Sequence, residues 1–298
     1  MQEKGFVTIA TGDDRFMRLA YDLKKSYDYQ HQDIKYPWAI LTDKRDDYLS
    51  IFEKVVILPH ATCSYLDKIT MLSIAPWDEN IFVDADCLIY GDISNLFDYS
   101  PFRGVRHMGD RLPISSKGKG WFDIENIGKF RKSVNFKIHS NGELIFFDKS
   151  ETTYEIYKTC LDIVNHWPEL RFREFSLPAD EPIMALSMAV HNCPPIQDNL
   201  EKYVYFYRVH KKICKIDIKN GELSYVNKWN DKRYDNVPIA HWGNQETNGY
   251  LYKSEVLKME GVTYWYGYKV FWSCHDNILR VIYKIKANLY RLSNLRSK

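Results

Sequence analysis

Two aspartates separated by one residue, Asp84 and Asp86, are the residues of this sequence whose types and spacing point most directly to chemistry. They follow an apolar run at 81–83 that has the character of a buried strand, and alternate side chains of a strand share one face. Two carboxylates on one face repel each other unless a cation lies between them, and hard divalent cations prefer such oxygen ligands. The alternative is an ordinary surface turn or helix cap, but the buried strand before the pair favours a cation site. A cation there would neutralise the negative charge of a diphosphate leaving group.

Other polar residues could complete such a site. Asp13 follows the first apolar segment of the chain, and Asp180 and Glu181 open another apolar segment. This second pair consists either of site residues or of acids that stabilise a helix N-terminus, and the residues alone leave both interpretations open. His241 follows an apolar run at 237–240. A single histidine is more often structural, although a neutral imidazole beside two carboxylates suits Mn²⁺.

Short apolar strands that alternate with helices must position these residues. The alternation in the first third of the chain predicts an α/β fold with a doubly wound sheet. Such sheets bind ligands outside the carboxyl ends of their strands, and the acidic pairs Asp13-Asp14 and Asp84-Asp86 both fall at such ends. We expect strands at 5–11, 38–42, 54–58 and 80–83, and helices at 15–27 and 66–75.

The middle of the chain is less regular. Residues 106–135 are polar and contain several glycines, which predicts a long loop of the kind that is more often functional than inert. Beyond them, apolar patterns predict a strand at 144–147 and helices at 152–165 and 180–190. Residues 215–226 are predicted to form a β-hairpin around an Asn-Gly turn.

Composition limits the class of protein. The 298 residues are 45% hydrophobic, which allows a sizeable core, and a net charge of +2 argues against a general nucleic-acid binder. Six scattered cysteines without a CxxC pair predict reduced, buried thiols in a cytoplasmic protein. The N-terminus lacks the long apolar region of a signal peptide, and no run of about 20 apolar residues could span a membrane.

Residues 68–86, KITMLSIAPWDENIFVDAD, resemble the signature region of the retaining glycosyltransferases of family eight, which includes glycogenin. In that family a helix led by lysine precedes an apolar strand that runs into Asp-x-Asp. The resemblance implies that Lys68 contacts the donor and that Asp84 and Asp86 bind the metal ion. Ala85, between the two aspartates, would also line the donor site.

Residues 10–16, ATGDDRF, are similar to the family's Ala-x-Asp-Asp-x-Tyr segment, with Gly12 as an added residue. The resemblance implies that Asp13 hydrogen-bonds the uracil and that Phe16 stacks on it. Ala10 and Thr11 would lie beside the base, and Arg15 would add positive charge near the donor.

Two later segments are similar to the family's donor-sugar site. The sequence Ser140-Asn141-Gly142 resembles its Asn-Ser-Gly, with the first two residues transposed. Asp180 and Glu181 resemble an Asp-Gln pair near the reactive carbon of the sugar. Here a glutamate replaces the glutamine, and a carboxylate could act as a nucleophile or base where an amide cannot.

The resemblance also implies that His241 is the third metal ligand. The Lys-Pro-Trp that follows this histidine in the family is absent, so Lys253 is the candidate cation for the diphosphate. The predicted fold is therefore the A-type glycosyltransferase fold, a Rossmann-like mixed sheet flanked by helices. The implied reaction is transfer of a hexose from a UDP-sugar to a glycan or lipid-linked acceptor, with retention and with Mn²⁺ or Mg²⁺.

Two other classes of protein remain as alternatives. Another nucleotide-dependent transferase would carry a glycine-rich basic loop after its first strand, whereas Gly12, Asp13 and Asp14 form an acidic one. A catalytically inactive nucleotide-sugar or carbohydrate-binding protein is the second alternative, because the Asp-Glu pair and the missing Lys-Pro-Trp depart from the family.

The C-terminal part of the chain differs in character from the rest. We expect a catalytic domain at 1–250 and a helical appendage, rich in aromatic and basic residues, at 251–298. Residues 277–298 have apolar residues at helical spacing, several basic residues and no acid. This pattern predicts a peripheral helix on anionic lipid, on the inner face of the cytoplasmic membrane. A helix packed on its own domain or on a second subunit of a homodimer is the alternative.

Overall fold

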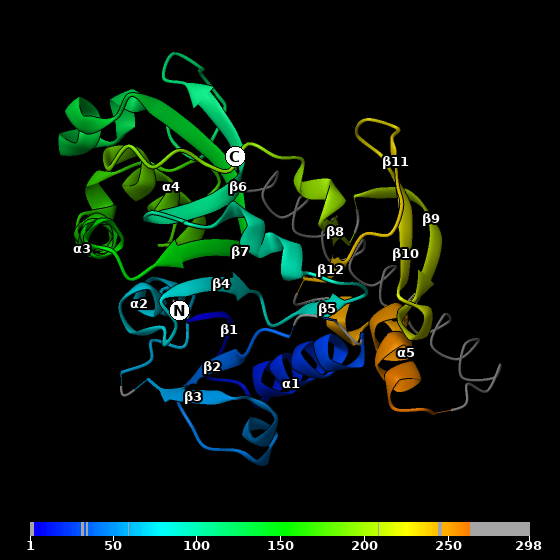
Figure 1. Cartoon of the computed structure of the whole chain (residues 1–298). Coiled ribbons are helices and arrows are strands. Elements are labelled where there is room, and N and C mark those ends of the chain that lie inside the picture. Colours follow the sequence, from blue (N-terminus) through cyan, green and yellow to red (C-terminus); the bar gives the residue numbers. More distant parts are fainter. Residues whose placement is uncertain are drawn as a thin grey trace, which may run out of the picture.

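The centre of the molecule is a six-stranded mixed sheet with the strand order β3-β2-β1-β4-β7-β6 (Figure 1). β1 (Lys4–Ala10) pairs in parallel with both β2 (Trp38–Thr42) and β4 (Glu79–Val83), and β2 pairs in parallel with β3 (Lys54–Ile57). The computed structural model describes residues 3–30, 33, 35–58, 60–207, 209–243 and 246–262.

The sheet changes direction at its other half. β7 (Phe136–Asp148) runs antiparallel to β4 on one side and to β6 (Val105–Pro113) on the other. The α/β class and the mixed sheet that the sequence predicted are thus confirmed. All four parallel strands end at the same edge of the sheet, and the acidic cluster after β4 lies there.

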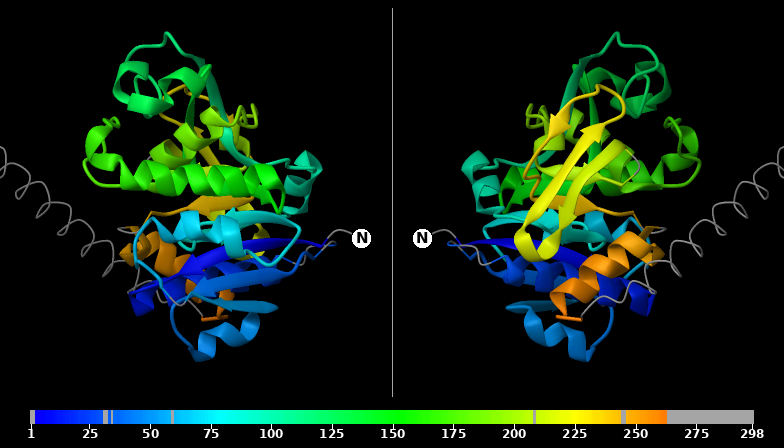
Figure 2. Two further views of the ribbon diagram at one scale, coloured as in Figure 1. Left: turned by 90° about the vertical axis from the view of Figure 1, so that its left-hand side faces the viewer. Right: turned by 90° about the vertical axis from the view of Figure 1, so that its right-hand side faces the viewer.

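Helices cover both faces of this sheet (Figures 1 and 2). α1 (Asp14–Tyr29) packs on one face, and α2 (Asp67–Ile74), α3 (Glu151–Asn165) and α4 (Asp180–Val190) pack on the other. Alternate residues of each strand point to opposite faces. In β4, for example, Ile81 and Val83 belong to the core beneath α1, whereas Phe82 belongs to the core beneath the other three helices.

Two small sheets extend the fold. One has the order β5-β12-β8 and contains β5 (Cys87–Ile89), β8 (Val204–Phe206) and β12 (Ile239–His241). β5 follows directly after the Asp-x-Asp turn, so this sheet brings residue 241 beside residue 87.

The other small sheet, at the right of Figure 1, has the order β11-β10-β9. It contains β9 (His210–Asp217), β10 (Glu222–Asn227) and β11 (Arg233–Tyr234). β9 and β10 form the predicted hairpin, and Gly221 in its turn has a φ of 63°, which favours glycine.

Short 3₁₀ helices connect several of these elements. They span Asp47–Ile51, Ser94–Tyr99, Ile124–Asn126, Gly128–Ser133, Trp167–Glu169, Leu200–Lys202, Ile218–Asn220 and Glu246–Asn248. α5 (Tyr250–Met259) follows the last of them and packs against α1, where the Tyr252 hydroxyl donates to Asp22 Oδ2 at 3.2 Å.

The prediction of one long loop at 106–135 was wrong. Its first part forms the edge strand β6, and two 3₁₀ helices follow within the rest. Among the described residues β6 pairs with β7 and, beyond it, only through a short bridge between Met108 and Ile196, so the exposed outer half of β6 can carry polar residues, and its sequence pattern resembles a loop. The strand predicted at 144–147 is the end of the 13-residue β7.

Other expectations have mixed outcomes. Among the described cysteines, all of which are free thiols, Cys87, Cys160 and Cys193 are buried as predicted, but Cys63 is exposed. No helix in the described part of the chain is long and apolar enough to cross a membrane. The predicted peripheral helix at 277–298 lies outside the described residues, and the division at residue 250 stays a prediction.

Candidate active site

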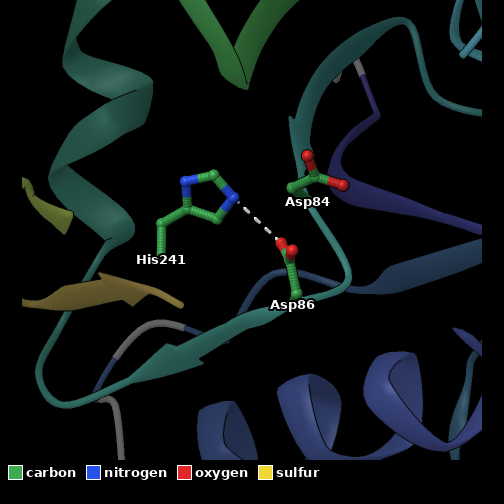
Figure 3. A group of neighbouring side chains, drawn as sticks. All are labelled: Asp84, Asp86 and His241. Carbon is green, nitrogen blue, oxygen red and sulfur yellow. Dashed lines mark ion pairs between the residues drawn. The ribbon is translucent and has the colours of Figure 1, made fainter. Parts of the chain in front are cut away.

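Asp84, Asp86 and His241 lie together where β4, β5 and β12 meet (Figure 3). Each offers one ligand atom, and these atoms all lie within 4.8 Å of one another. Their side chains are 25%, 13% and 20% exposed, so the cluster is recessed but open enough to admit an ion. Two carboxylate oxygens and an imidazole nitrogen form a donor set that suits Mn²⁺ and that Mg²⁺ can share.

The backbone fixes the Asp84–Asp86 turn from two sides. On one side, the Asp84 N–H donates to the carbonyl of Glu143 in β7 at 3.1 Å. On the other side, the Trp242 N–H donates to the carbonyl of Asp86 at 3.1 Å, and His241 is paired with Cys87. The two aspartates are therefore held between β7 and β12 by contacts that do not use their carboxylates.

The charges of the cluster are coupled. His241 Nε2 lies 3.0 Å from Asp86 Oδ1. Burial lowers the pKa of His241, but Asp86, Glu143 and Asp84 outweigh it and raise this pKa to about 9. Burial raises the pKa of Asp86, but the charge and hydrogen bond of His241 lower it below its usual value. Burial raises the pKa of Asp84 and Asp86 adds to this effect, while Lys68 opposes it. Without a cation, the imidazolium thus serves as the positive partner of Asp86.

Lys68 of α2 connects the cluster to α4. Its Nζ lies 2.8 Å from Asp84 Oδ2, 3.2 Å from Asp180 Oδ2 and 3.4 Å from the carbonyl oxygen of Gly142. Burial lowers the pKa of Lys68, but Asp180 and Asp84 outweigh this effect and raise the pKa well above its usual value. Lys68 is therefore a permanent cation between the two carboxylates.

Asp180 and Glu181 lie at the N-terminus of a helix, as one of the two interpretations of the sequence expected. They form the first turn of α4, and they also point toward β7. The Gly142 N–H donates to Glu181 Oε1 at 3.0 Å, and a Cβ on Gly142 would lie 2.8 Å from Asp180 Oδ2. Only glycine fits at this approach of strand and helix. Burial, with the charge of Asp180, raises the pKa of Glu181 to about 7.

Ser140 and Asn141 lie on β7 near these acids. The Ser140 hydroxyl is 3.1 Å from Nδ1 of His107, and its carbonyl accepts the indole N–H of Trp121 at 3.0 Å. Burial lowers the pKa of His107 to about 4. The sequence analysis did not single out His107, which the structure places at hydrogen-bonding distance from Ser140.

The predicted base-binding residues lie at the C-terminal end of β1 and at the start of α1. Ala10 ends β1, and the Thr11 hydroxyl donates to Asp67 Oδ2 at 2.7 Å. Asp13 caps α1 by accepting the Arg15 N–H at 2.8 Å. The Arg15 guanidinium lies 5.2 Å from the centre of the Phe16 ring.

A cavity of about 330 Å³ lies between α1 and α5. Arg15 and Arg18 line it from α1, and Asn248 and Lys253 line it from the C-terminal side. It therefore brings together Arg15 and Lys253, both of which the sequence assigned to the charged part of a donor. The three residues of the cation cluster do not line this cavity.

Sequence reasoning did not single out Glu143. This residue is 2% exposed, and neither carboxyl oxygen has a hydrogen-bond partner among the described residues. Burial raises the pKa of Glu143 to about 8, with His241 opposing the effect and Glu181 and Asp84 adding to it. The available signal was a charged residue directly before the apolar run at 144–147 of a buried strand.

Comparisons with known proteins give matches in structure but not in sequence. The sequence matches no protein family and no curated protein. The fold matches an active-site mutant of LgtC in which a glutamine is replaced by glutamate, with 12% identity and a TM-score of 0.55. It also matches the galactosyltransferase LgtC in complex with donor and acceptor sugar analogues, with 12% identity and a TM-score of 0.52. Both matches cover 89% of this chain and 99% of LgtC.

A third match is the apo structure of WbbM, a bifunctional glycosyltransferase, with 10% identity and a TM-score of 0.55. It covers 89% of this chain and 50% of WbbM, so this chain corresponds to half of that protein. At such low identities the likeness is one of fold. The mixed sheet with its flanking helices has the A-type glycosyltransferase fold of LgtC, as the resemblance to family eight implied.

Proposed function

We propose that this chain is a metal-dependent glycosyltransferase that moves a hexose from a UDP-sugar to a glycan or lipid-linked acceptor with retention. The observation that carries the proposal is the convergence of Asp84, Asp86 and His241 in a recessed cluster at the carboxyl end of β4. The fold supports it, because LgtC, which shares the fold, is a galactosyltransferase crystallised with donor and acceptor sugar analogues.

In this proposal, Asp84, Asp86 and His241 hold Mn²⁺ or Mg²⁺. The bound ion supplies positive charge that stabilises the departing UDP. Lys68 contributes by fixing Asp84 and Asp180 at 2.8 and 3.2 Å, so that neither carboxylate has to reorganise when substrate binds.

The donor nucleotide would extend from this cluster toward the start of α1. Asp13 and Phe16 are the proposed contacts of the uracil, with Ala10 and Thr11 beside it. Arg15 and Lys253, which line one cavity, are the proposed cations for the rest of the donor. Ser140, Asn141, Gly142 and Ala85 are the proposed contacts of the sugar.

Asp180 and Glu181 are the proposed groups at the reactive carbon. Because burial raises the pKa of Glu181 to about 7, its carboxyl can gain or lose a proton near neutral pH. In its ionised form it could attack the sugar, displacing UDP, and water or acceptor would then release the sugar from it. One LgtC structure carries a glutamine-to-glutamate exchange in its active site, and Glu181 is the glutamate that this proposal places at the reactive carbon.

Titration calorimetry with UDP tests the proposal. We expect UDP to bind in the presence of Mn²⁺ and to bind at least about tenfold more weakly in EDTA, because the ion would bridge protein and diphosphate. UDP binding that does not depend on the metal, or no UDP binding at all, would refute the proposal. A screen of nucleotide-sugars for hydrolysis in Mn²⁺ would then identify the donor.

A further inference from the structure

Glu143 is a buried acid beside the cation cluster that the proposed reaction does not use. Its side chain is 2% exposed, and no other residue of the described chain donates a hydrogen bond to either of its carboxyl oxygens. A buried carboxyl without donors is costly, because nothing replaces the water that it has lost. A donor supplied by a ligand or by a rearrangement of the site would remove this cost.

The same cluster contains a buried ring nitrogen that lacks a hydrogen-bond partner. Nδ1 of His241 also has no hydrogen-bond partner among the described residues, although Nε2 of the same ring is 3.0 Å from Asp86. In Figure 3, Nε2 faces Asp86 and the other ring nitrogen points away from both aspartates. The cluster thus has an acceptor without a donor and a ring nitrogen without a partner.

The backbone places Glu143 and His241 on either side of the same turn. The carbonyl of Glu143 accepts the Asp84 N–H at 3.1 Å, and Trp242, next to His241, donates to the carbonyl of Asp86 at 3.1 Å. The largest favourable charge interaction of the Glu143 carboxyl is the one with His241. Glu143 is therefore the acid outside the Asp84–Asp86 pair that acts most strongly on this imidazole.

A histidine that binds a metal through one ring nitrogen needs an acceptor for the proton on the other. Carboxylates commonly fill this role, and they fix both the tautomer and the orientation of the ring. If a cation occupies Nε2 of His241, the ring proton must lie on Nδ1, inside the protein. Asp84 and Asp86 do not accept it, because this nitrogen points away from both of them (Figure 3).

We propose that Glu143 is a positioning residue for His241. When a divalent cation replaces the contact between Asp86 and His241 Nε2, the Glu143 carboxylate accepts the proton of Nδ1 and holds the ring toward the ion. This inference rests on the cation site of the proposed function and adds to it the group that keeps the third ligand in its binding tautomer. No family resemblance assigned a role to position 143.

Binding of Mn²⁺ to the full chain tests the proposal without any assay of turnover. Free Mn²⁺ is followed by its electron paramagnetic resonance signal for the wild type, Glu143→Leu, Glu143→Gln and Glu181→Gln. We expect Glu143→Leu to bind Mn²⁺ about 10- to 100-fold more weakly, which is the usual effect of removing such a partner. Glu143→Gln should lose less, because its amide oxygen can still accept a hydrogen bond.

Glu181→Gln is the matched control for charge. It removes an acid of the same site whose pKa is affected by the charges of Asp180, Lys68 and Asp84 and not by that of His241. Its loss of Mn²⁺ affinity should be smaller than that of Glu143→Leu. Equal losses in the two variants, or an affinity of Glu143→Leu within about twofold of the wild type, would overturn the proposal.

Nuclear magnetic resonance of the ¹⁵N-histidine-labelled, Mg²⁺-saturated protein distinguishes a positioning role from a purely structural one, because a purely structural role would not change exchange of the His241 ring proton. The Nδ1–H of His241, assigned by its loss in His241→Asn, should be protected from exchange in the wild type. In Glu143→Leu it should exchange rapidly, while melting curves check that the fold is retained. A protected Nδ1–H in folded Glu143→Leu contradicts the proposal. Failure of the wild type to bind any divalent cation would instead contradict the cation site itself.

Discussion

Asp86 has a double attachment, since its carbonyl is bound by Trp242 and its carboxylate is paired with His241. A change at its side chain therefore leaves the backbone of the turn in place. The residue types and the spacing of Asp84 and Asp86 were sufficient to predict this pair from the sequence. The position of His241 was implied only by a family resemblance, because a partner 155 positions downstream has no local signal.

Asp86→Asn should abolish the cation site while preserving the fold. An amide is a poor ligand beside Asp84, and loss of the ion removes several kcal/mol of charge stabilisation. We expect the rate of donor hydrolysis or transfer to fall at least about 100-fold, since each 1.36 kcal/mol is a factor of ten. Asp110→Asn, at an exposed position of β6, is the control and should keep the wild-type rate. Wild-type turnover by Asp86→Asn in EDTA-treated solutions would contradict the cation's role.

Glu181→Gln tests whether the glutamate participates covalently. Its amide oxygen can still accept the Gly142 N–H, so the site should keep its geometry. If Glu181 attacks the sugar, turnover should fall at least about 100-fold while UDP affinity in Mn²⁺ changes little. The measurements are steady-state kinetics and mass spectrometry for a glycosyl adduct on the wild type. Normal turnover by the variant would rule out double displacement through this residue.

The free energy of unfolding should depend on pH through His107. Burial lowers its pKa in the folded protein to about 4, below the usual value of about 6.5 in an unfolded chain. The uncharged ring therefore stabilises the fold fully above about pH 6.5, and this stability is lost as the pH falls toward 4. The loss could reach about 3 kcal/mol. Denaturant unfolding at pH 7 and pH 4.5 should show a smaller pH effect in His107→Gln than in the wild type. Equal effects in both proteins would contradict the assignment.

At the scale of elements, strand ends and helix starts determine the site. The parallel strands and α1 to α4 were predictable, because each has a clear apolar period and a boundary residue such as Asp13 at α1. β6 was not, because an edge strand tolerates polar residues. β5, β8 and β12 have three residues each, which is too short for a periodic signal, yet they bring His241 to the aspartates. The sequence did not predict a role for Glu143, because this residue reaches Asp84 through long-range pairing of the backbone, which leaves no local pattern of residue types.

Gly142→Ala should disturb the contact between β7 and α4. Its Cβ would lie 2.8 Å from Asp180 Oδ2 and 3.2 Å from Glu181 Cγ, so the side chains of these two acids, or the start of α4, must shift. Such overpacking typically costs about 1–3 kcal/mol of unfolding free energy, and the displaced acids should also reduce turnover. Gly91→Ala is a suitable control, because its Cβ would meet Pro238 at an ordinary 3.5 Å. Chemical denaturation and kinetics of the two variants give the comparison, and equal stability losses would contradict this account.

At the scale of the whole molecule, one sheet separates two cores, one beneath α1 and one beneath α2, α3 and α4. α5 joins the first of these cores and contacts α1 through Tyr252. The overall class was predictable from the alternation of strands and helices. For residues 277–298, the sequence predicts only a basic helix with apolar residues at helical spacing.

The tail prediction can be tested on the full chain. Because residues 277–298 carry basic side chains and no acid, we expect their deletion to weaken binding to vesicles that contain anionic lipid. Binding to neutral vesicles should be weak in both forms, and high salt should reduce the difference. Sedimentation with vesicles measures the effect. Unchanged binding after deletion would remove the membrane interpretation, and a change in oligomeric mass would favour contact with a second subunit.

The pairing of β12 with β5 has a consequence for the order in which the molecule is made. All six strands of the main sheet lie within the first 148 residues, and both aspartates leave the ribosome long before His241. A nascent chain can therefore contain all the strands of this sheet and two of the three proposed ligands, Asp84 and Asp86, before His241 has been made. Only after residues 239–241 have docked beside β5 is the set of ligands complete. If the cation site is as proposed, tight metal binding then marks a chain that has been made at least through His241, and a chain that ends before this residue would lack it even with all six strands of the main sheet.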